Sequence, residues 1–220
     1  MPITVQCDFD GTITEGEVSH LLLDRFAEGD WRREVKLFES GEISVATCMK
    51  RAFAMVKADE STITNFILNS DRWKFRPGFN GLYDYCLKKG FRFVIVSNGL
   101  TFYIKAILGS IGVDDIEIIA ARSRSSSRGM LLQYPGPDGR ETDSDFKEEY
   151  TRYLEKQGYR VVCLGDSISD IFTARRAYRV FATGALREHC RREKIAFTPF
   201  KDFGEVVRGL EKLPEEPSGL

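Results

Sequence analysis

The chain has 220 residues, of which 42% are hydrophobic and 30% charged, a balance that predicts a packed core rather than disorder. Its 32 Lys and Arg nearly cancel 33 Asp and Glu, which argues against a generally basic nucleic-acid binder. No apolar run reaches the ~18 residues of a membrane span, and the acid at Asp8 comes too early for a signal peptide. Five widely spaced cysteines without a Cys-x-x-Cys pair predict reduced thiols and a cytoplasmic protein.

Short apolar runs rich in β-branched residues alternate along the chain with helical patterns. The runs predict strands at Ile3–Cys7 and at residues 91–96, 116–121, 161–164 and 180–182. The helical patterns lie at residues 79–89, 101–108, 169–178 and 186–194 and at Phe146–Lys156. This alternation predicts an α/β fold with a doubly wound, Rossmann-like parallel sheet and right-handed crossovers.

Residues 17–75 contain no strand-like run and have apolar residues at helical spacing in 17–27, in 44–56 and again in 63–67. Ser44 has the character of a helix N-cap. So long a helical segment exceeds a simple crossover. We therefore expect a helical cap of residues 17–75, inserted into a core made of residues 1–16 and 76–213.

Residues 121–145 are polar and rich in turn formers. We expect the Ser/Arg run at 122–128 to be a mobile surface loop and residues 130–134 to form a short hairpin. The tail at 214–220, with Pro and Glu residues, is expected to fray.

Ligands of such sheets bind beyond the carboxyl ends of the strands, and chemically active residues follow three of the predicted strands. These residues are Asp8 and Asp10 after the first strand, Ser97, Asn98 and Gly99 after the second, and Asp166 and Asp170 after the fourth. Lys147 begins the helix before that fourth strand. Four carboxylates, a hydroxyl and a lysine are thus predicted to converge on one rim.

Like-charged carboxylates at ~4 Å repel each other by about 4 kcal/mol at an effective dielectric constant near ~20. A hard cation such as Mg²⁺ relieves that repulsion and suits oxygen ligands. Asp8 and Asp10 face the same side of the strand end, so Asp8 is the candidate nucleophile and Asp10 the candidate acid and base. Ser97, Lys147 and the N–H groups that follow the strands are candidate phosphate donors.

The segment Asp8–Thr12, Ser97, Lys147 and the segment Gly165–Asp170 resemble the four ordered motifs of the haloacid dehalogenase superfamily of phosphatases. The helical insert resembles the cap of its phosphoserine-phosphatase-like branch. Residues 40–44 and 197–200 are similar to the methionine-salvage phosphatases, which act on 2-hydroxy-3-keto-5-methylthiopentenyl-1-phosphate. The resemblance implies an aspartyl-phosphate on Asp8 and Mg²⁺ bound by Asp8, Asp166 and the main-chain carbonyl of Asp10. It also implies that Asp170 supports the metal or Lys147.

The substrate is expected to be a small phosphorylated metabolite, bound by a monomer or homodimer without nucleic acid or membrane. Glu17 matches the acid with which phosphoserine phosphatases bind the substrate amine, but their cap arginine aligns with Ala52 here. The Cys-rich insert found in many methionine-salvage relatives is absent from the segment before Lys147. Three other enzyme activities therefore stay open: phosphoserine phosphatase, phosphotransferase and phosphonate hydrolase. Two non-enzyme alternatives also stay open, a receiver-type phosphoacceptor and a catalytically silent binding protein.

The two histidines and Cys7 are expected to have no catalytic or metal-binding role. His20 is expected to pack in the cap, His189 to lie solvated on a helix of mixed charge, and Cys7 to be a small buried apolar residue.

Overall fold

The computed structural model describes residues 1–142 and 146–214. The tail that was expected to fray lies outside the described residues, except for Pro214. Within the described ranges, no helix is long and apolar enough to cross a membrane.

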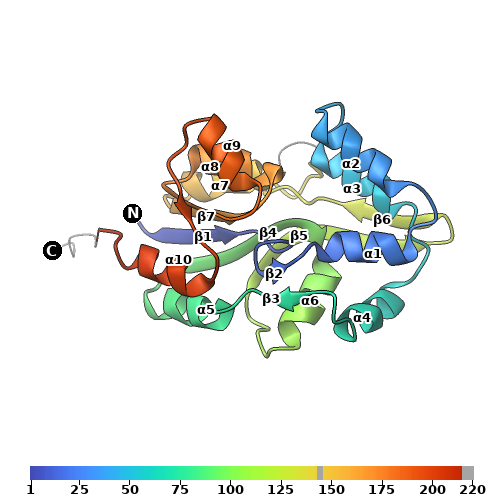
Figure 1. The fold of residues 1–220 in the computed structure, drawn as a ribbon, viewed down its shortest axis with the longest axis horizontal. Helices are drawn as coiled ribbons and strands as arrows, with labels where there is room; N and C mark the ends of the chain where they lie inside the picture. Colours follow the sequence, from blue (N-terminus) through green and yellow to red (C-terminus); the bar gives the residue numbers. More distant parts are fainter. Residues whose placement is uncertain (143–145, 215–220) are drawn as a thin grey trace.

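A seven-stranded sheet forms the centre of the molecule, in the spatial order β6-β5-β4-β1-β7-β8-β9 (Figure 1). Its strands are β1 (Ile3–Cys7), β4 (Arg92–Leu100), β5 (Glu117–Ser126), β6 (Gly129–Gln133), β7 (Arg160–Gly165), β8 (Arg179–Ala182) and β9 (Thr198–Pro199). Strand β6 pairs antiparallel with β5, and all other neighbours pair in parallel. The predicted α/β fold with a doubly wound sheet is confirmed.

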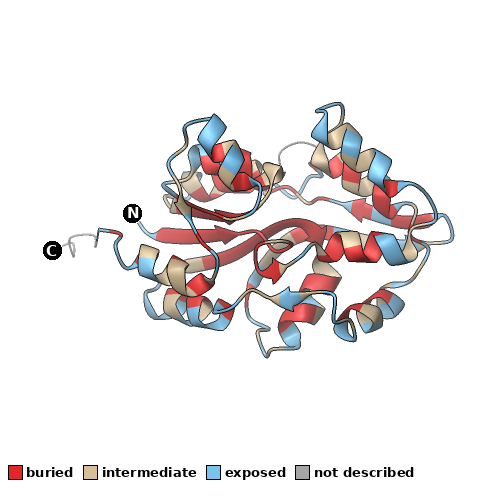
Figure 2. Cartoon of the chain, in the orientation of Figure 1, coloured by how far each residue is buried: buried red, intermediate tan, exposed pale blue. Residues whose placement is uncertain are grey.

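Helices cover both faces of this sheet (Figure 1). One face carries α5 (Phe79–Lys88), α6 (Thr101–Gly109) and α10 (Phe203–Leu210), and the other carries α7 (Phe146–Lys156), α8 (Ile171–Arg176) and α9 (Leu186–Arg192). A 3-10 turn at Ile168–Asp170 precedes α8. Because both faces are covered, β1, β4 and β7 are buried almost from end to end (Figure 2).

Two strands extend beyond the predicted ends. Strand β4 continues through residues 97–99 with a register shift between Val96 and Leu100. Strand β5 continues through Ser126 and pairs antiparallel with β6, so the prediction of a mobile loop at 122–128 was wrong for residues 122–126. Residues 127 and 128 form the turn between the two strands. The predicted hairpin strand needs a hydrogen-bonded partner, and the Ser/Arg run provides it, since polar side chains do not prevent pairing where they face water.

Two elements after α9 had no prediction. Strand β9, at the edge of the sheet, has only two residues, too few to produce a periodic pattern. Helix α10 follows it in the chain.

The inserted segment contains α1 (Val18–Phe26), α2 (Trp31–Glu39), α3 (Val45–Phe53) and α4 (Glu60–Leu68). Ser44 caps α3 as predicted, because its hydroxyl accepts a hydrogen bond from the Thr47 N–H at 3.1 Å. The segment is not free of strands, since β3 (Lys74–Phe75) pairs antiparallel with β2 (Thr14–Glu15). This pairing brings the start and the end of the insert side by side, at the edge of the core.

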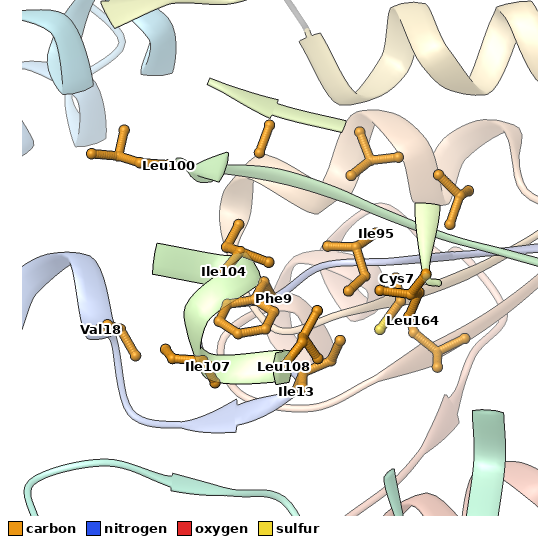
Figure 3. Close-up of a cluster of buried hydrophobic side chains, with 14 of the residues drawn as sticks. Cys7, Phe9, Ile13, Val18, Ile95, Leu100, Ile104, Ile107, Leu108 and Leu164 are labelled. Carbon is orange, nitrogen blue, oxygen red and sulfur yellow. The ribbon is translucent and has the colours of Figure 1, made fainter. Parts of the chain in front are cut away.

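The loop after β1 is anchored in the hydrophobic core (Figure 3). Phe9 and Ile13 are fully buried and belong to the same cluster as Ile104 and Leu108 of α6. Burying one such side chain stabilises the fold by ~1.5–3 kcal/mol. The two acids that flank Phe9 are therefore presented by a segment whose apolar side chains hold it in place.

Candidate active site

The carboxylates that follow β1 and β7 meet because these strands are neighbours in the sheet. Asp8 follows β1, and its N–H donates to the carbonyl of Leu164 in β7 at 2.9 Å. Asp166 follows β7, and Asp170 lies in the 3-10 turn that comes next. One carboxylate oxygen from each of Asp8, Asp166 and Asp170 lies within 4.8 Å of the others. The side chains of three of the four predicted acids thus form one group.

Lys147 is the cation that contacts this group. Its Nζ lies 2.9 Å from Oδ2 of Asp8 and 2.7 Å from Oδ1 of Asp170, and only 4% of its side chain is exposed. Burial opposes the positive charge, but the carboxylates of Asp170 and Asp8 outweigh it and raise the pKa of Lys147. The lysine therefore stays protonated between two carboxylates.

Buried polar side chains that sequence reasoning missed hold the start of α7, which carries Lys147. The Gln6 amide donates to the Lys147 carbonyl at 3.0 Å and to the Thr173 hydroxyl at 3.1 Å. The Thr151 hydroxyl lies 3.0 Å from the Gln6 side-chain oxygen. A glutamine in a fully buried strand is the signal that could have revealed this network, because a buried amide needs hydrogen-bond partners.

The loop after β1 is shaped around Asp166. Gly11 has a φ of +74°, and a Cβ there would lie 2.3 Å from Oδ2 of Asp166, so both conformation and space require glycine. The Thr12 hydroxyl donates to Oδ1 of Asp166 at 3.1 Å. Arg76, which follows β3, donates to the carbonyls of Gly11 and Thr12 at 2.7 and 2.8 Å and ties this loop to the end of the insert.

The carboxylate of Asp10 does not belong to the three-acid group. Its Oδ2 accepts hydrogen bonds from the Tyr103 hydroxyl at 2.6 Å and from the Ser19 N–H at 3.3 Å. Its Oδ1 is buried and has no hydrogen-bond partner among the described residues. Burial raises the pKa of Asp10, and the hydrogen bonds from Tyr103 and Ser19 partly oppose that rise.

Residues 97–99 line the same site from the irregular end of β4. Ser97 is 1% exposed, and its hydroxyl accepts a hydrogen bond from the Gly99 N–H at 3.1 Å. Both polar atoms of the Asn98 side chain are buried and lack a partner in the described part of the chain. Buried polar atoms without partners mark a place where a ligand or water can bind.

A cavity of about 390 Å³ connects these groups with the inserted helices. Its core wall includes Asp8, Asp10, Ser97, Asn98, Gly99 and Lys147. The wall of α2 and α3 consists of the apolar Val35, Phe38, Val45, Cys48 and Met49 and of one acid, Glu39. His20 and His189 also border the cavity, and His20 packs against Trp31 with ring centroids 4.9 Å apart. The cavity therefore has one charged end and one mainly apolar side.

Residues 5–175, from β1 into α8, match the haloacid dehalogenase-like hydrolase family. The chain belongs to this family. The resemblance predicted from Asp8–Thr12, Ser97, Lys147 and Gly165–Asp170 is confirmed.

Relatives of this hydrolase match it over nearly its full length. A 2-hydroxy-3-keto-5-methylthiopentenyl-1-phosphate phosphatase from Exiguobacterium sibiricum is 29% identical over 218 residues, covering 96% of this chain and 97% of that protein. One from Brevibacillus brevis is 28% identical over 215 residues, covering 96% of each chain.

Solved structures share the fold of this hydrolase. A phospho-aspartyl intermediate analogue of phosphoserine phosphatase has a TM-score of 0.69 and 19% identity, covering 94% of this chain and 98% of that one. A substrate-bound phosphoserine phosphatase has a TM-score of 0.70 and 16% identity, covering 95% and 98%. At such identities the likeness concerns the fold.

Glu17 of this hydrolase lies at the N-cap of α1 and borders the cavity. Its side chain makes no capping hydrogen bond. Burial, together with the nearby carboxylates of Asp10 and Asp8, raises the pKa of Glu17 to about 8. The group therefore faces the cavity rather than the end of its own helix.

Acids outnumber cations in the described part of the site. Burial, with the charges of Asp8 and Asp170, raises the pKa of Asp166 to about 9. Burial also raises the pKa of Asp8 to about 7, although Lys147 lowers it. A bound cation reverses this effect, because it favours the ionised carboxylates. The group of Asp8, Asp166 and Asp170 could hold a metal ion.

Proposed function

We propose that this hydrolase is a phosphomonoesterase that transfers the phosphate of a small metabolite first to Asp8 and then to water. The observation that carries the proposal is the buried contact of Lys147 with Asp8 and Asp170, beside Asp166, at the charged end of the cavity. Phosphoryl transfer requires chiefly positioning and charge neutralisation, and these groups offer both. The names of the relatives support the same class of reaction.

The cofactor we propose is Mg²⁺. Among the described residues, the group consists of two buried carboxylates and the half-buried Asp166, with Lys147 beside them, and this set of oxygen ligands fits a hard divalent cation. It contains no His or Cys, the ligands that zinc favours. Asp8, Asp166 and the main-chain carbonyl of Asp10 would hold the ion, with Asp170 supporting it or Lys147. When bound, the ion offsets the negative charge of the carboxylates and of the phosphate oxygens.

Asp8 is the nucleophile in this mechanism, held by the Phe9 N–H at 2.7 Å and by Lys147. Its carboxylate forms a bond to phosphorus while the bond to the leaving oxygen breaks, and Asp10 gives that oxygen a proton. Water then attacks the aspartyl-phosphate, Asp10 takes a proton from it, and inorganic phosphate leaves as the bond to Asp8 breaks. Ser97, Asn98 and Gly99 lie on the wall that would face the phosphate oxygens.

The substrate we propose is 2-hydroxy-3-keto-5-methylthiopentenyl-1-phosphate, the compound in the names of the relatives. The apolar wall that includes Val35, Phe38 and Met49 suits its thioether end. Phosphoserine, the alternative, carries a carboxylate that would need a cation on the cap. Ala52 is buried and apolar at the position of the expected arginine, and Arg51 pairs with Glu34 at 3.3 Å on the exposed side of α3.

The other enzyme activities and the two non-enzyme functions remain as alternatives. A phosphotransferase or phosphonate hydrolase would use the same residues, so only an assay separates them from a phosphatase. A receiver-type phosphoacceptor has no counterpart of α1–α4, and a silent binding protein has no need of the buried Lys147. The division into a core of residues 1–16 and 76–213 and a cap of 17–75, like the monomeric or homodimeric state, stays a prediction.

The experiment that tests this function is a screen of the purified chain with Mg²⁺ against phosphorylated metabolites. The panel contains the methylthiopentenyl phosphate, phosphoserine and a phosphonate, and the Asp8→Asn variant is the control for contaminating phosphatases. We expect the largest kcat/KM on the methylthiopentenyl phosphate. Preference for phosphoserine would replace the substrate, and no phosphate release above the control from any compound would reject the function.

A further inference from the structure

Tyr103 is a fully buried side chain near the start of α6 whose hydroxyl donates to a carboxylate. The hydroxyls of Tyr134 and Tyr150, by contrast, donate to the backbone carbonyls of Asn98 and Pro135. The distance from the Tyr103 hydroxyl to Oδ2 of Asp10 is 2.6 Å, within the range of charge-assisted O–H···O hydrogen bonds. Tyr103 is thus bound to the acid and base of the proposed mechanism, and sequence reasoning did not single it out.

Gly99 makes room for this contact. A Cβ at residue 99 would lie 2.0 Å from the Tyr103 hydroxyl oxygen and 2.9 Å from its Cζ. Such distances are far inside van der Waals contact, so any larger residue displaces the Tyr103 ring from Asp10. Glycine at this position therefore has a role besides offering its backbone to a phosphate.

The two oxygens of Asp10 have different surroundings. Oδ2 accepts hydrogen bonds from Tyr103 and from the Ser19 N–H, whereas Oδ1 is buried without a partner in the described chain. In a neutral carboxyl group the carbonyl oxygen is the acceptor and the other oxygen carries the proton. Two donors on Oδ2 therefore make it the acceptor and leave the proton to Oδ1.

We propose that Tyr103 is a positioning residue that holds Oδ2 of Asp10, so that Oδ1 gives the proton to the leaving oxygen and takes one from water. This inference rests on the proposed function. The proton leaves Oδ1 as the bond from phosphorus to the leaving oxygen breaks, and the attacking water returns one to Oδ1 in the second step. Without the Tyr103 hydroxyl, the carboxyl group turns about its Cβ–Cγ bond and presents its proton less often to the substrate.

The test is Tyr103→Phe, which removes the hydroxyl and keeps the ring. We compare kcat/KM for phenyl phosphate, whose leaving oxygen needs a proton, with kcat/KM for 4-nitrophenyl phosphate, whose leaving oxygen hardly needs one. The ratio of kcat/KM for phenyl phosphate to kcat/KM for 4-nitrophenyl phosphate should fall about ten- to a hundredfold in the variant. This is the scale of one charge-assisted hydrogen bond. Tyr150→Phe loses a hydroxyl bond to a carbonyl away from Asp10, and it should leave the ratio unchanged.

Gly99→Ala is a second variant, which keeps both groups and forces them apart. It should lower the same ratio, so the inference is tested even where Tyr103→Phe does not fold. A ratio that is unchanged in a folded variant, or equal losses on both phosphates, would overturn the positioning role.

A double-mutant cycle asks whether Tyr103 acts through Asp10. In an Asp10→Asn background, Tyr103→Phe should change the ratio no further, and an additional fall would overturn the inference. Failure of the proposed function has a different signature: Asp8→Asn would stay active, or Asp10→Asn alone would leave the ratio at its wild-type value. The second result would overturn the role of Tyr103 as well.

Discussion

The two walls of the cavity differ in the kind of side chains that form them. On the core wall, charged groups contact one another directly, as Lys147 contacts Asp8 and Asp170. On the wall formed by α2 and α3, apolar side chains such as Phe38 and Met49 face the cavity. Glu17, at the N-cap of α1, brings a carboxyl group to the side of the insert.

The difference has a physical origin in the supporting backbone. Adjacent strands lie ~4.8 Å apart, so residues at their ends are held at separations suited to sharing one cation or one phosphate. Helices in an insert can change their exposed side chains without disturbing that spacing. We infer that the core determines the reaction and the insert selects the metabolite, and the following predictions test this division.

Asp8→Asn should have the largest effect, because it removes the attacking carboxylate of the core wall. We expect turnover of 4-nitrophenyl phosphate to fall about a thousandfold or more, with no loss of thermal stability because a crowded buried charge is also removed. Asp59→Asn is the matched control, since Asp59 is the N-cap of α4 and asparagine caps equally well. Near wild-type turnover in Asp8→Asn would end the aspartyl-phosphate mechanism.

Removal of the metal should have the next largest effect on activity. Excess chelator should abolish activity and Mg²⁺ restore it, whereas Ca²⁺ should support little turnover because its looser coordination disturbs the in-line geometry. Asp166→Asn should raise the Mg²⁺ concentration for half-maximal activity at least about tenfold. The exposed Asp138→Asn serves as the control. Full activity in chelator would refute the metal site as a whole.

Glu17→Gln probes the other wall. A carboxyl group that binds an amine or hydroxyl of the metabolite contributes ~1.5–3 kcal/mol, so kcat/KM for the metabolite should fall about ten- to a hundredfold. The value for 4-nitrophenyl phosphate, which offers Glu17 nothing to bind, should hardly change. Glu15→Gln, which breaks the ion pair with Lys74 outside the cavity, is the control. If the ratio between the two substrates does not move, Glu17 has no part in selection.

The smallest effect concerns stability and pH. The pKa of Asp166 is raised from its ordinary value of 3.8 to about 9, so the folded state favours the protonated carboxyl group. The contribution of Asp166 to the free energy of unfolding is therefore fully present below about pH 4 and is lost as the pH rises toward 9. Without metal, the melting temperature should therefore decrease with pH more steeply in the wild type than in Asp166→Asn. A difference of a few degrees is expected, since 1 kcal/mol shifts Tm by roughly 2–4 °C at this size. Equal slopes in scanning calorimetry would contradict the crowding of these acids.

Bound Mg²⁺ should remove this difference by pairing with the ionised carboxylates. The increase in Tm on adding Mg²⁺ should consequently be larger at pH 8 than at pH 5. A larger increase at the lower pH would argue that the ion binds elsewhere.

The sequence alone was sufficient for the fold class, the family and the order of the central elements. Strand β1 matched its predicted bounds, and β7 and β8 began one residue before theirs. Continuous apolar runs and helical spacing are local properties, so they are readable without contacts. The convergence of Asp8, Asp166 and Asp170 was predictable for a related reason: parallel strands end at one edge of a sheet.

Other features were decided by tertiary structure. The Ser/Arg run at 122–126 reads as a loop by composition, but β6 supplies the partner that makes it a strand. Tyr103 meets Asp10 across 93 residues, and Gln6 meets the Lys147 carbonyl across 141. A single polar residue inside an apolar element does not show in the sequence which partner it binds, because tertiary packing brings that partner from a distant part of the chain. The sequence thus determined which groups we propose for the chemistry, and the three-dimensional packing decided which buried side chains hold them in position.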